Sequence, residues 1–178
     1  MKFGAERLVS RRKLGGLFLD VNLATQPGCY SLIISLRRKR TIRVGKLGVA
    51  RFPKGAYVYT GSAMGGLAAR LKRHLTRKKK IRWHIDYLLK LPEAHLNKVI
   101  VHPPAANQEC RQNQRIAALP GATVVLKRFG ATDCKSGCES HLYFFAKRLQ
   151  LKLTASLSAL PALHSARRGT QFRFSPAR

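Results

Sequence analysis

The strongest constraint on the fold of this chain is a change in the period of its apolar residues after residue 60. In the run AYVYT, residues 56–60, side chains would alternate between the two faces of a strand, so that Tyr57 and Tyr59 share one face. Beyond the glycines at 61, 65 and 66, apolar residues recur at helical spacing, at Met64, Leu67, Leu71 and Leu75. We therefore predict a strand that turns sharply into a helix over residues 66–77.

The other segments complete an α+β pattern. Runs of β-favouring residues predict further short strands at residues 29–36 (CYSLIISL), 41–44, 98–101, 123–126 and 142–145. Two more helices are expected, one at 83–91 before Pro92 and one at 108–119 after the N-cap residue Asn107. This order favours a small central antiparallel or mixed β-sheet flanked by helices.

We expect one folded domain with two basic extensions. The chain has 178 residues, enough for one ordinary core, and the predicted elements occupy residues 28–146. Residues 1–27 are predicted to be an N-terminal arm without the apolar core of a signal peptide, and residues 147–178 a mobile basic tail. With no apolar stretch of about 20 residues, no membrane span is expected. Four cysteines in a chain of this length favour a reducing compartment, so we expect a cytoplasmic protein associated with the nucleoid.

The charge of the chain indicates a polyanionic partner. Thirty-five Lys and Arg residues against seven Asp and Glu residues give a net charge of +28, which would destabilise a compact chain unless a polyanion is near. Nucleic acid is the first candidate, DNA before RNA, ahead of a membrane surface or simple ribosome association. Cationic side chains on the outer side of the predicted helix and in the run after it either form a solvated face or follow a DNA backbone: Lys72, Arg73, Arg77, Lys78, Lys79 and Lys80.

The order of the short motifs resembles the GIY-YIG nuclease family. The first family motif corresponds to Gly28-Cys29-Tyr30 and the second to Tyr59-Thr60-Gly61, with Cys29 and Thr60 where the family has isoleucine. The arginine and histidine of the family helix then fall on Arg70 and His74. The longer runs GSAMGGL, WHIDYLL, FGATDC and SHLYFF resemble the DUF123 or Uri-type branch of that superfamily, and the resemblance covers about residues 28–146.

The resemblance implies a nuclease site. Tyr30, Tyr59, Arg70 and His74 would be catalytic, with the arginine contacting phosphate and the tyrosines acting as phenolates or proton relays. Each tyrosine is also an ordinary strand residue that would pack in the core, and Tyr57 is expected only to support the other two.

A phosphodiesterase of this kind also needs a carboxylate to hold Mg²⁺ or Mn²⁺. Glu109 lies where the family places its metal-binding glutamate, although an acid is also favoured there by the helix dipole. Asp86 is the second candidate, although an ion pair with Lys90 one helical turn away accounts for it better than a metal site does.

The cysteines raise the separate possibility of a zinc site. Cys134, Cys138 and His141 are closely spaced, and Cys110 would complete a set of three cysteines and one histidine. The alternative is a group of buried thiols with local hydrogen bonds.

Two functions follow from the sequence. The first is a metal-dependent endonuclease that hydrolyses DNA phosphodiester bonds, in repair or defence. The alternative is a nucleic-acid-binding protein that keeps a nuclease-like fold without the chemistry, and a zinc-stapled interaction protein is a third option.

Overall fold

A computed structural model describes residues 11–14, 17–20, 26–102, 108–146 and 171–173. The strands are β1 (Arg11–Leu14), β2 (Leu17–Asp20), β3 (Gly28–Leu36), β4 (Arg40–Arg43), β5 (Val49–Phe52), β6 (Gly55–Ala63), β7 (Ala94–His102), β8 (Thr123–Val124), β9 (Leu142–Phe145) and β10 (Gln171–Arg173). The helices are α1 (Leu67–Leu75), α2 (His84–Leu89), α3 (Gln108–Ala117) and the 3₁₀ turn η2 (Gly45–Leu47). Within these ranges, every helix is too short or too polar to cross a bilayer.

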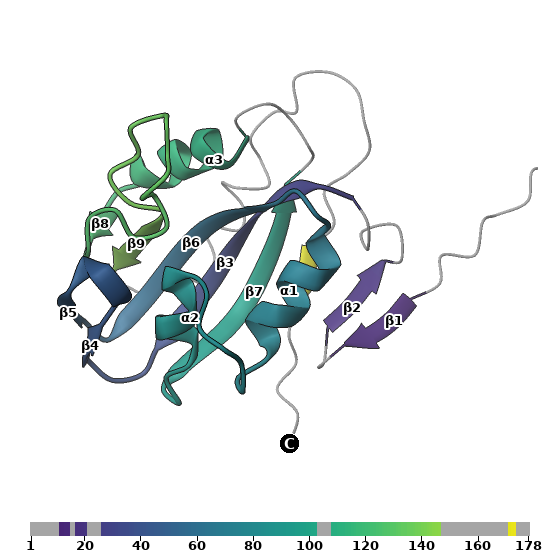
Figure 1. Cartoon of the computed structure of the whole chain (residues 1–178), viewed down its shortest axis with the longest axis horizontal. Helices are drawn as coiled ribbons and strands as arrows, with labels where there is room; N and C mark the ends of the chain where they lie inside the picture. Colours follow the sequence, from purple (N-terminus) through teal and green to yellow (C-terminus); the bar gives the residue numbers. More distant parts are fainter. Residues whose placement is uncertain (1–10, 15–16, 21–25, 103–107, 147–170, 174–178) are drawn as a thin grey trace, which may run out of the picture.

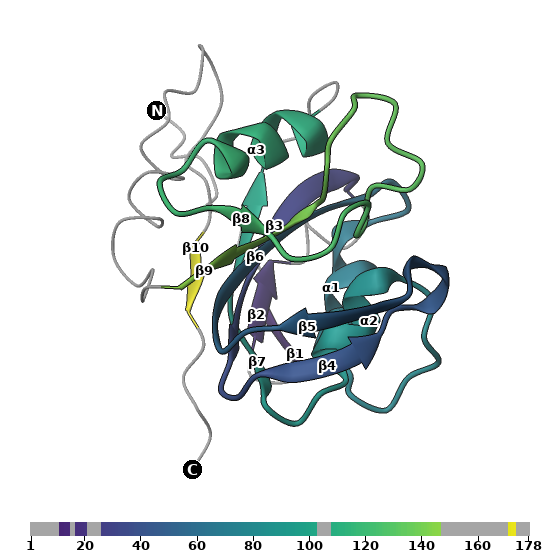
Figure 2. The same ribbon diagram turned by 90° about the vertical axis from the view of Figure 1, so that its left-hand side faces the viewer.

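The predicted α+β architecture is confirmed. A central antiparallel sheet has the strand order β10-β7-β3-β6-β9-β8, and two small hairpins, β1–β2 and β4–β5, lie outside it. Helices α1 and α2 cover one face of the sheet, and α3 covers the other (Figures 1 and 2).

The two faces of the sheet form separate cores because side chains alternate along the strands. Tyr30, Leu32, Ile34 and Leu36 of β3 pack with the apolar stripes of α1 and α2 in the larger core. Val58, on the other face of β6, packs with Ile116 of α3 and with aromatic residues of β9. Tyr57 is fully buried and its hydroxyl donates a hydrogen bond to the Pro53 carbonyl.

The pairing of β6 stops short on one side and so creates an opening in the sheet. Strand β9 pairs with β6 from Ala56 to Tyr59, and one further bond joins the Thr60 N–H to the His141 carbonyl at 3.0 Å. Strand β3, on the other side, pairs with β6 as far as Ala63. Among the described strands, the last three residues of β6 therefore have a neighbour on one side only.

Several boundaries differ from the predictions. Helix α1 ends at Leu75, because Thr76 takes an extended conformation, and the cationic run at 77–80 lies outside it. Strand β7 is longer than the predicted segment 98–101 because its pairing with β3 continues past an irregularity beside Ile33 and Ile34.

Parts of both predicted extensions form strands. The hairpin β1–β2 lies within the predicted arm, and β10, within the predicted mobile tail, pairs antiparallel with the edge strand β7. Residues 171–173 thus add a short strand to the open edge of the sheet, where backbone groups are available for pairing. The other residues of the predicted tail lie outside the described residues.

Candidate active site

A pocket of about 560 Å³ lies beside the unpaired part of β6. Four of the five residues expected at a nuclease centre line it: Tyr30 from β3, Tyr59 from β6, Arg70 from α1 and Glu109 from α3. The pocket thus joins side chains from helices that cover opposite faces of the sheet. They meet just beyond Leu142, the first residue of β9.

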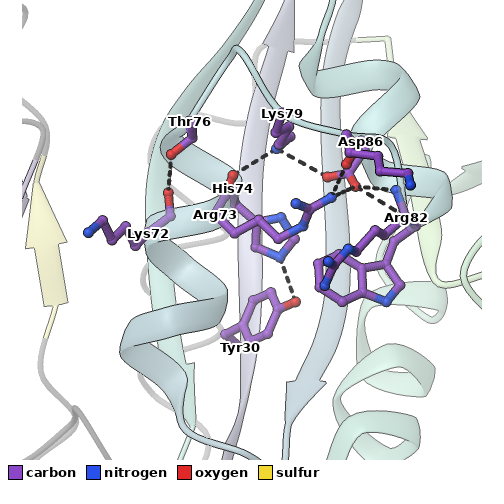
Figure 3. Close-up of polar contacts among 10 residues, drawn as sticks. Tyr30, Lys72, Arg73, His74, Thr76, Lys79, Arg82 and Asp86 are labelled. Carbon is purple, nitrogen blue, oxygen red and sulfur yellow. Dashed lines mark hydrogen bonds and ion pairs between the residues drawn. The ribbon is translucent and has the colours of Figure 1, made fainter.

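His74 stands behind the pocket instead of lining it. Its Nε2 is hydrogen-bonded to the Tyr30 hydroxyl at 2.7 Å (Figure 3), and the two side chains are 4% and 1% exposed. Burial, together with the nearby Lys79 charge, lowers the pKa of His74 to about 3, so its imidazole is neutral at neutral pH. The geometry gives His74 the role of orienting the Tyr30 hydroxyl.

The tyrosines are neutral phenols at neutral pH. Burial raises the pKa of Tyr30 well above 10.0, the neighbouring Tyr59 raises it further, and Arg70 offsets only part of the effect. Burial likewise raises the pKa of Tyr59. The phenolate form that the sequence suggested is therefore disfavoured, and the hydroxyls are available as hydrogen-bond donors or as proton relays.

Gly61 makes room for both tyrosine rings. A Cβ atom at this position would lie 2.6 Å from the Tyr30 hydroxyl oxygen and 3.0 Å from the Tyr59 ring. The sequence suggested a turn glycine, but Gly61 lies within β6, directly opposite Tyr30 in the register. Its missing side chain is what lets the two phenols approach the same point of the sheet.

Arg70 is held at the pocket by a tryptophan. Its guanidinium carbon lies 3.8 Å from the centre of the Trp83 ring, and that of Arg73 lies 4.7 Å from the same ring. Such cation–π contacts fix the plane of a guanidinium that would otherwise move freely. Trp83 is half-buried, packs against the larger core and also lines the pocket.

Glu109 is an ionised carboxylate with both oxygens engaged. Ser62 Oγ donates to its Oε2 at 2.5 Å, and His141 Nδ1 lies 3.2 Å from its Oε1. Burial alone would raise the pKa of Glu109, but the contacts with His141 and Ser62 outweigh it and lower the pKa. The side chain is still 27% exposed, so a ligand in the pocket can reach it.

Asp86 lies outside the pocket. Its carboxylate is 0% exposed and contacts Arg73 at 2.7 Å and Lys79 at 3.1 Å, while the N–H groups of Arg82 and Trp83 donate to it at 3.0 and 3.2 Å (Figure 3). Sequence reasoning offered a surface pair with Lys90, but these partners tie α2 to the end of α1 instead. This carboxylate is fully buried outside the pocket and is paired with two cations, which indicates a structural role for Asp86.

Four of the six cationic residues predicted to contact DNA are exposed, and two are not. Lys72, Arg77, Lys78 and Lys80 are exposed, as a contact surface for DNA requires. Arg73 and Lys79 are instead occupied by Asp86 and largely buried.

A second basic hollow of about 750 Å³ was not predicted. It is lined by Pro53 and the cationic residues Arg37, Arg38, Lys39, Arg40, Arg51 and Lys54. Arg37 follows β3 directly, seven residues after Tyr30, which at roughly 3.3 Å per residue places the hollow about 23 Å from the pocket.

Two further polar residues line the pocket without having been predicted there. The Gly130 N–H donates to His84 Nδ1 at 3.0 Å, so the neutral ring carries its proton on Nε2. Asp133, an exposed residue, adds a second carboxylate to the pocket wall. His84 begins α2, and Asp133 lies in the loop before β9, so only the tertiary structure brings the two residues to one pocket.

The predicted cysteines and histidine are brought together beside the same pocket. The possible ligand atoms of Cys110, Cys134, Cys138 and His141 all lie within 4.8 Å of one another, and the sulfurs of Cys110 and Cys134 are 3.6 Å apart. Burial raises the pKa of the Cys134 thiol, but backbone N–H groups of Cys138 and Ser136 reverse this and hold the pKa at about 7. This group could hold a metal ion.

Comparison with known proteins gives one family. A family model described as "Domain of unknown function DUF123" matches residues 29–162, and the chain therefore belongs to that family. No curated protein and no solved structure matches the chain.

A substitution at Gly61 tests the packing of the phenols. Gly61→Ala is expected to lower the free energy of unfolding by about 1–3 kcal/mol, because the added methyl group collides with Tyr30. Gly65→Ala is the matched control, since its Cβ meets no heavy atom within 4 Å. Urea unfolding measures both, and equal effects would show that the space at Gly61 is not needed.

The Asp86 ion pairs predict a specific response to acid. The pKa of Asp86 lies below its ordinary value of 3.8, because hydrogen bonds from Arg82, Lys79, Arg73 and Trp83 outweigh its burial. Its contribution to stability is therefore complete above that value and is lost as pH falls through the lowered pKa.

Asp86→Asn should cost about 3–5 kcal/mol at neutral pH, because two cations lose a buried partner, and should remove this part of the acid dependence. Glu139→Gln is the control, since Glu139 pairs with Lys127 at an exposed site and its change should stay within about 0.5 kcal/mol. Unfolding curves at neutral and acid pH measure both. Equal losses in the two variants would contradict the structural role of Asp86.

Proposed function

We propose that the protein is a metal-dependent endonuclease that hydrolyses DNA phosphodiester bonds at this pocket. The observation that carries the proposal is the convergence of Tyr30, Tyr59, Arg70 and Glu109 on one cavity. The net charge of +28 and the resemblance of the motifs to GIY-YIG nucleases support it.

The residues at the pocket suit a hard divalent cation. Mg²⁺ binds through one or two carboxylates and keeps several waters and substrate phosphate oxygens, and Glu109 with Asp133 supplies such a set. When bound, Mg²⁺ or Mn²⁺ would supply an activated water and would neutralise charge on the phosphate. Ser62 would keep the Glu109 carboxylate turned toward the pocket.

Arg70 and the phenols would act on the phosphate itself. Arg70 carries a permanent charge, and its planar guanidinium can hold two phosphate oxygens while it stacks on Trp83. Tyr30 and Tyr59, as neutral phenols, would donate hydrogen bonds to phosphate or align the attacking water. His74 would fix the direction of the Tyr30 hydroxyl.

We further propose that the group of Cys110, Cys134, Cys138 and His141 binds Zn²⁺. Thiolate and imidazole donors select zinc over magnesium, while the carboxylates of the pocket prefer the harder ion. The two metals would then have separate tasks, one in folding and one in chemistry.

Substitutions of Glu109 and Arg70 test the endonuclease proposal. The wild-type protein should cleave single-stranded, nicked or branched DNA in the presence of Mg²⁺ or Mn²⁺. Glu109→Gln and Arg70→Lys should each lower kcat about 100- to 1,000-fold, because each removes a charge or geometry needed in the transition state.

Lys127→Gln is the control variant, because Lys127 is 80% exposed and does not line the pocket. Gel-based cleavage assays measure the rates, and circular dichroism checks that each variant is folded. DNA cleavage that persists in both site variants would exclude this pocket as the catalytic centre.

A non-catalytic nucleic-acid-binding protein is the second candidate, favoured by the basic hollow at the end of β3. For both candidate functions, DNA affinity should fall steeply as the salt concentration rises, because contacts with phosphate release counterions. Both functions fit a protein found on the nucleoid.

Replacing Arg37, Arg38 and Arg51 by Gln should weaken DNA binding. The slope of the logarithm of the binding constant against the logarithm of the salt concentration should also become shallower, by about one for each phosphate that is no longer neutralised. Fluorescence anisotropy over a range of salt concentrations measures this. The matched control replaces three lysines outside the hollow, Lys46, Lys90 and Lys127, so that the decrease in net charge is the same. If both triple variants bind DNA equally weakly, net charge and not the hollow determines binding. Salt-dependent binding without any turnover would favour the second candidate over the first.

A further inference from the structure

His141 connects the cysteine cluster with Glu109. Its ring is buried, with 4% of the side chain exposed, and Nδ1 lies 3.2 Å from Glu109 Oε1. Neither ring nitrogen makes a hydrogen bond of good geometry to any residue that the structure describes. A buried imidazole with this much unused capacity indicates a ligand.

The cluster is already close to the dimensions of a zinc site. Zinc–sulfur bonds of about 2.3 Å in a tetrahedron place two sulfurs roughly 3.8 Å apart, and Cys110 and Cys134 are 3.6 Å apart. Its ligands come from the first turn of α3 and from the loop before β9, so that one ion would join these segments.

We propose that the metal in this cluster positions Glu109 through His141, an inference that rests on the proposed function of the pocket. Because Nδ1 faces Glu109, the ligand nitrogen is Nε2. A metal on Nε2 fixes the proton on Nδ1, which then donates to Glu109 Oε1. Metal-bound histidines usually have such an outer partner, and here that partner is the carboxylate of the second site.

The proposed arrangement would hold both oxygens of the carboxylate. Ser62 donates to Oε2, and the His141 ring, with its proton fixed on Nδ1, would donate to Oε1, which lies 3.2 Å away. The metal therefore determines where Glu109 presents its remaining lone pairs in the pocket. His141 is a positioning residue, because it acts on the pocket only through Glu109.

The coupling must be reciprocal, because two linked binding events change each other's free energy by the same amount. A residue of the pocket should then affect the affinity for zinc, although it is not a zinc ligand. This consequence can be measured without DNA and without any second metal.

The first experiment measures zinc affinity of the full chain by competition with a chromophoric chelator. Glu109→Ala should weaken zinc binding by about 10- to 100-fold, since it removes the outer partner of His141. Glu139→Ala is the matched control, because it removes the same charge next to Cys138 at an exposed position and should leave zinc affinity unchanged. Equal zinc affinity in wild type and Glu109→Ala, or no stoichiometric zinc in wild type, would overturn the proposal.

The second experiment uses His141→Cys, which offers four sulfur ligands but removes the hydrogen-bond partner of Glu109. Zinc content should stay stoichiometric, and Mn²⁺ affinity, measured by electron paramagnetic resonance without DNA, should fall about 10- to 100-fold. A zinc-loaded His141→Cys protein that binds Mn²⁺ like wild type overturns the positioning role.

The two proposals fail separately. If the wild type neither binds Mn²⁺ nor cleaves DNA, the endonuclease proposal is wrong, and the zinc affinity of Glu109→Ala still decides whether His141 links the cluster to Glu109.

Discussion

The candidate site depends on the space above Gly61, where the sheet carries no side chain. Tyr30 and Tyr59 bring their rings to this point from two paired strands, and a single methyl group would collide with both. Because β9 begins only at Leu142, opposite Tyr59, the adjacent edge of β6 stays open. The pocket therefore lies where Gly61 has no side chain and where, among the described strands, the end of β6 has a partner on one side only.

Two acids illustrate how surroundings decide the role of a carboxylate. Asp86 is buried between two cations and two backbone N–H groups, and these contacts hold α1 and α2 together. Glu109 has one neutral hydroxyl and one imidazole as partners and stays open to the pocket. In a chain with so few acids, this difference separates a structural ion pair from a candidate metal ligand.

The positions of Glu109 and Cys110, adjacent at the start of α3, place two kinds of donor side by side. The carboxylate lines the same pocket as the phenols and Arg70, and the thiol belongs to the cysteine cluster. Hard and soft donors are thus separated by a single peptide bond and joined again through His141. Membership of the DUF123 family does not by itself assign an activity, so the functional argument depends on this geometry.

The sequence by itself determined the α+β fold, the two tyrosine strands, the helix with Arg70, and the residues of the cysteine cluster, because period and local spacing are properties of the chain. Only the tertiary structure decided that His74 is hydrogen-bonded to Tyr30 and that Arg70 stacks on Trp83. It also decided that Asp86 pairs with Arg73 and Lys79. It also placed His84 and Asp133 in the pocket and gathered the basic hollow. The physical reason is that stacking, ion pairing and burial act between residues that are distant in sequence, and the pKa of each tyrosine follows from the packing around it.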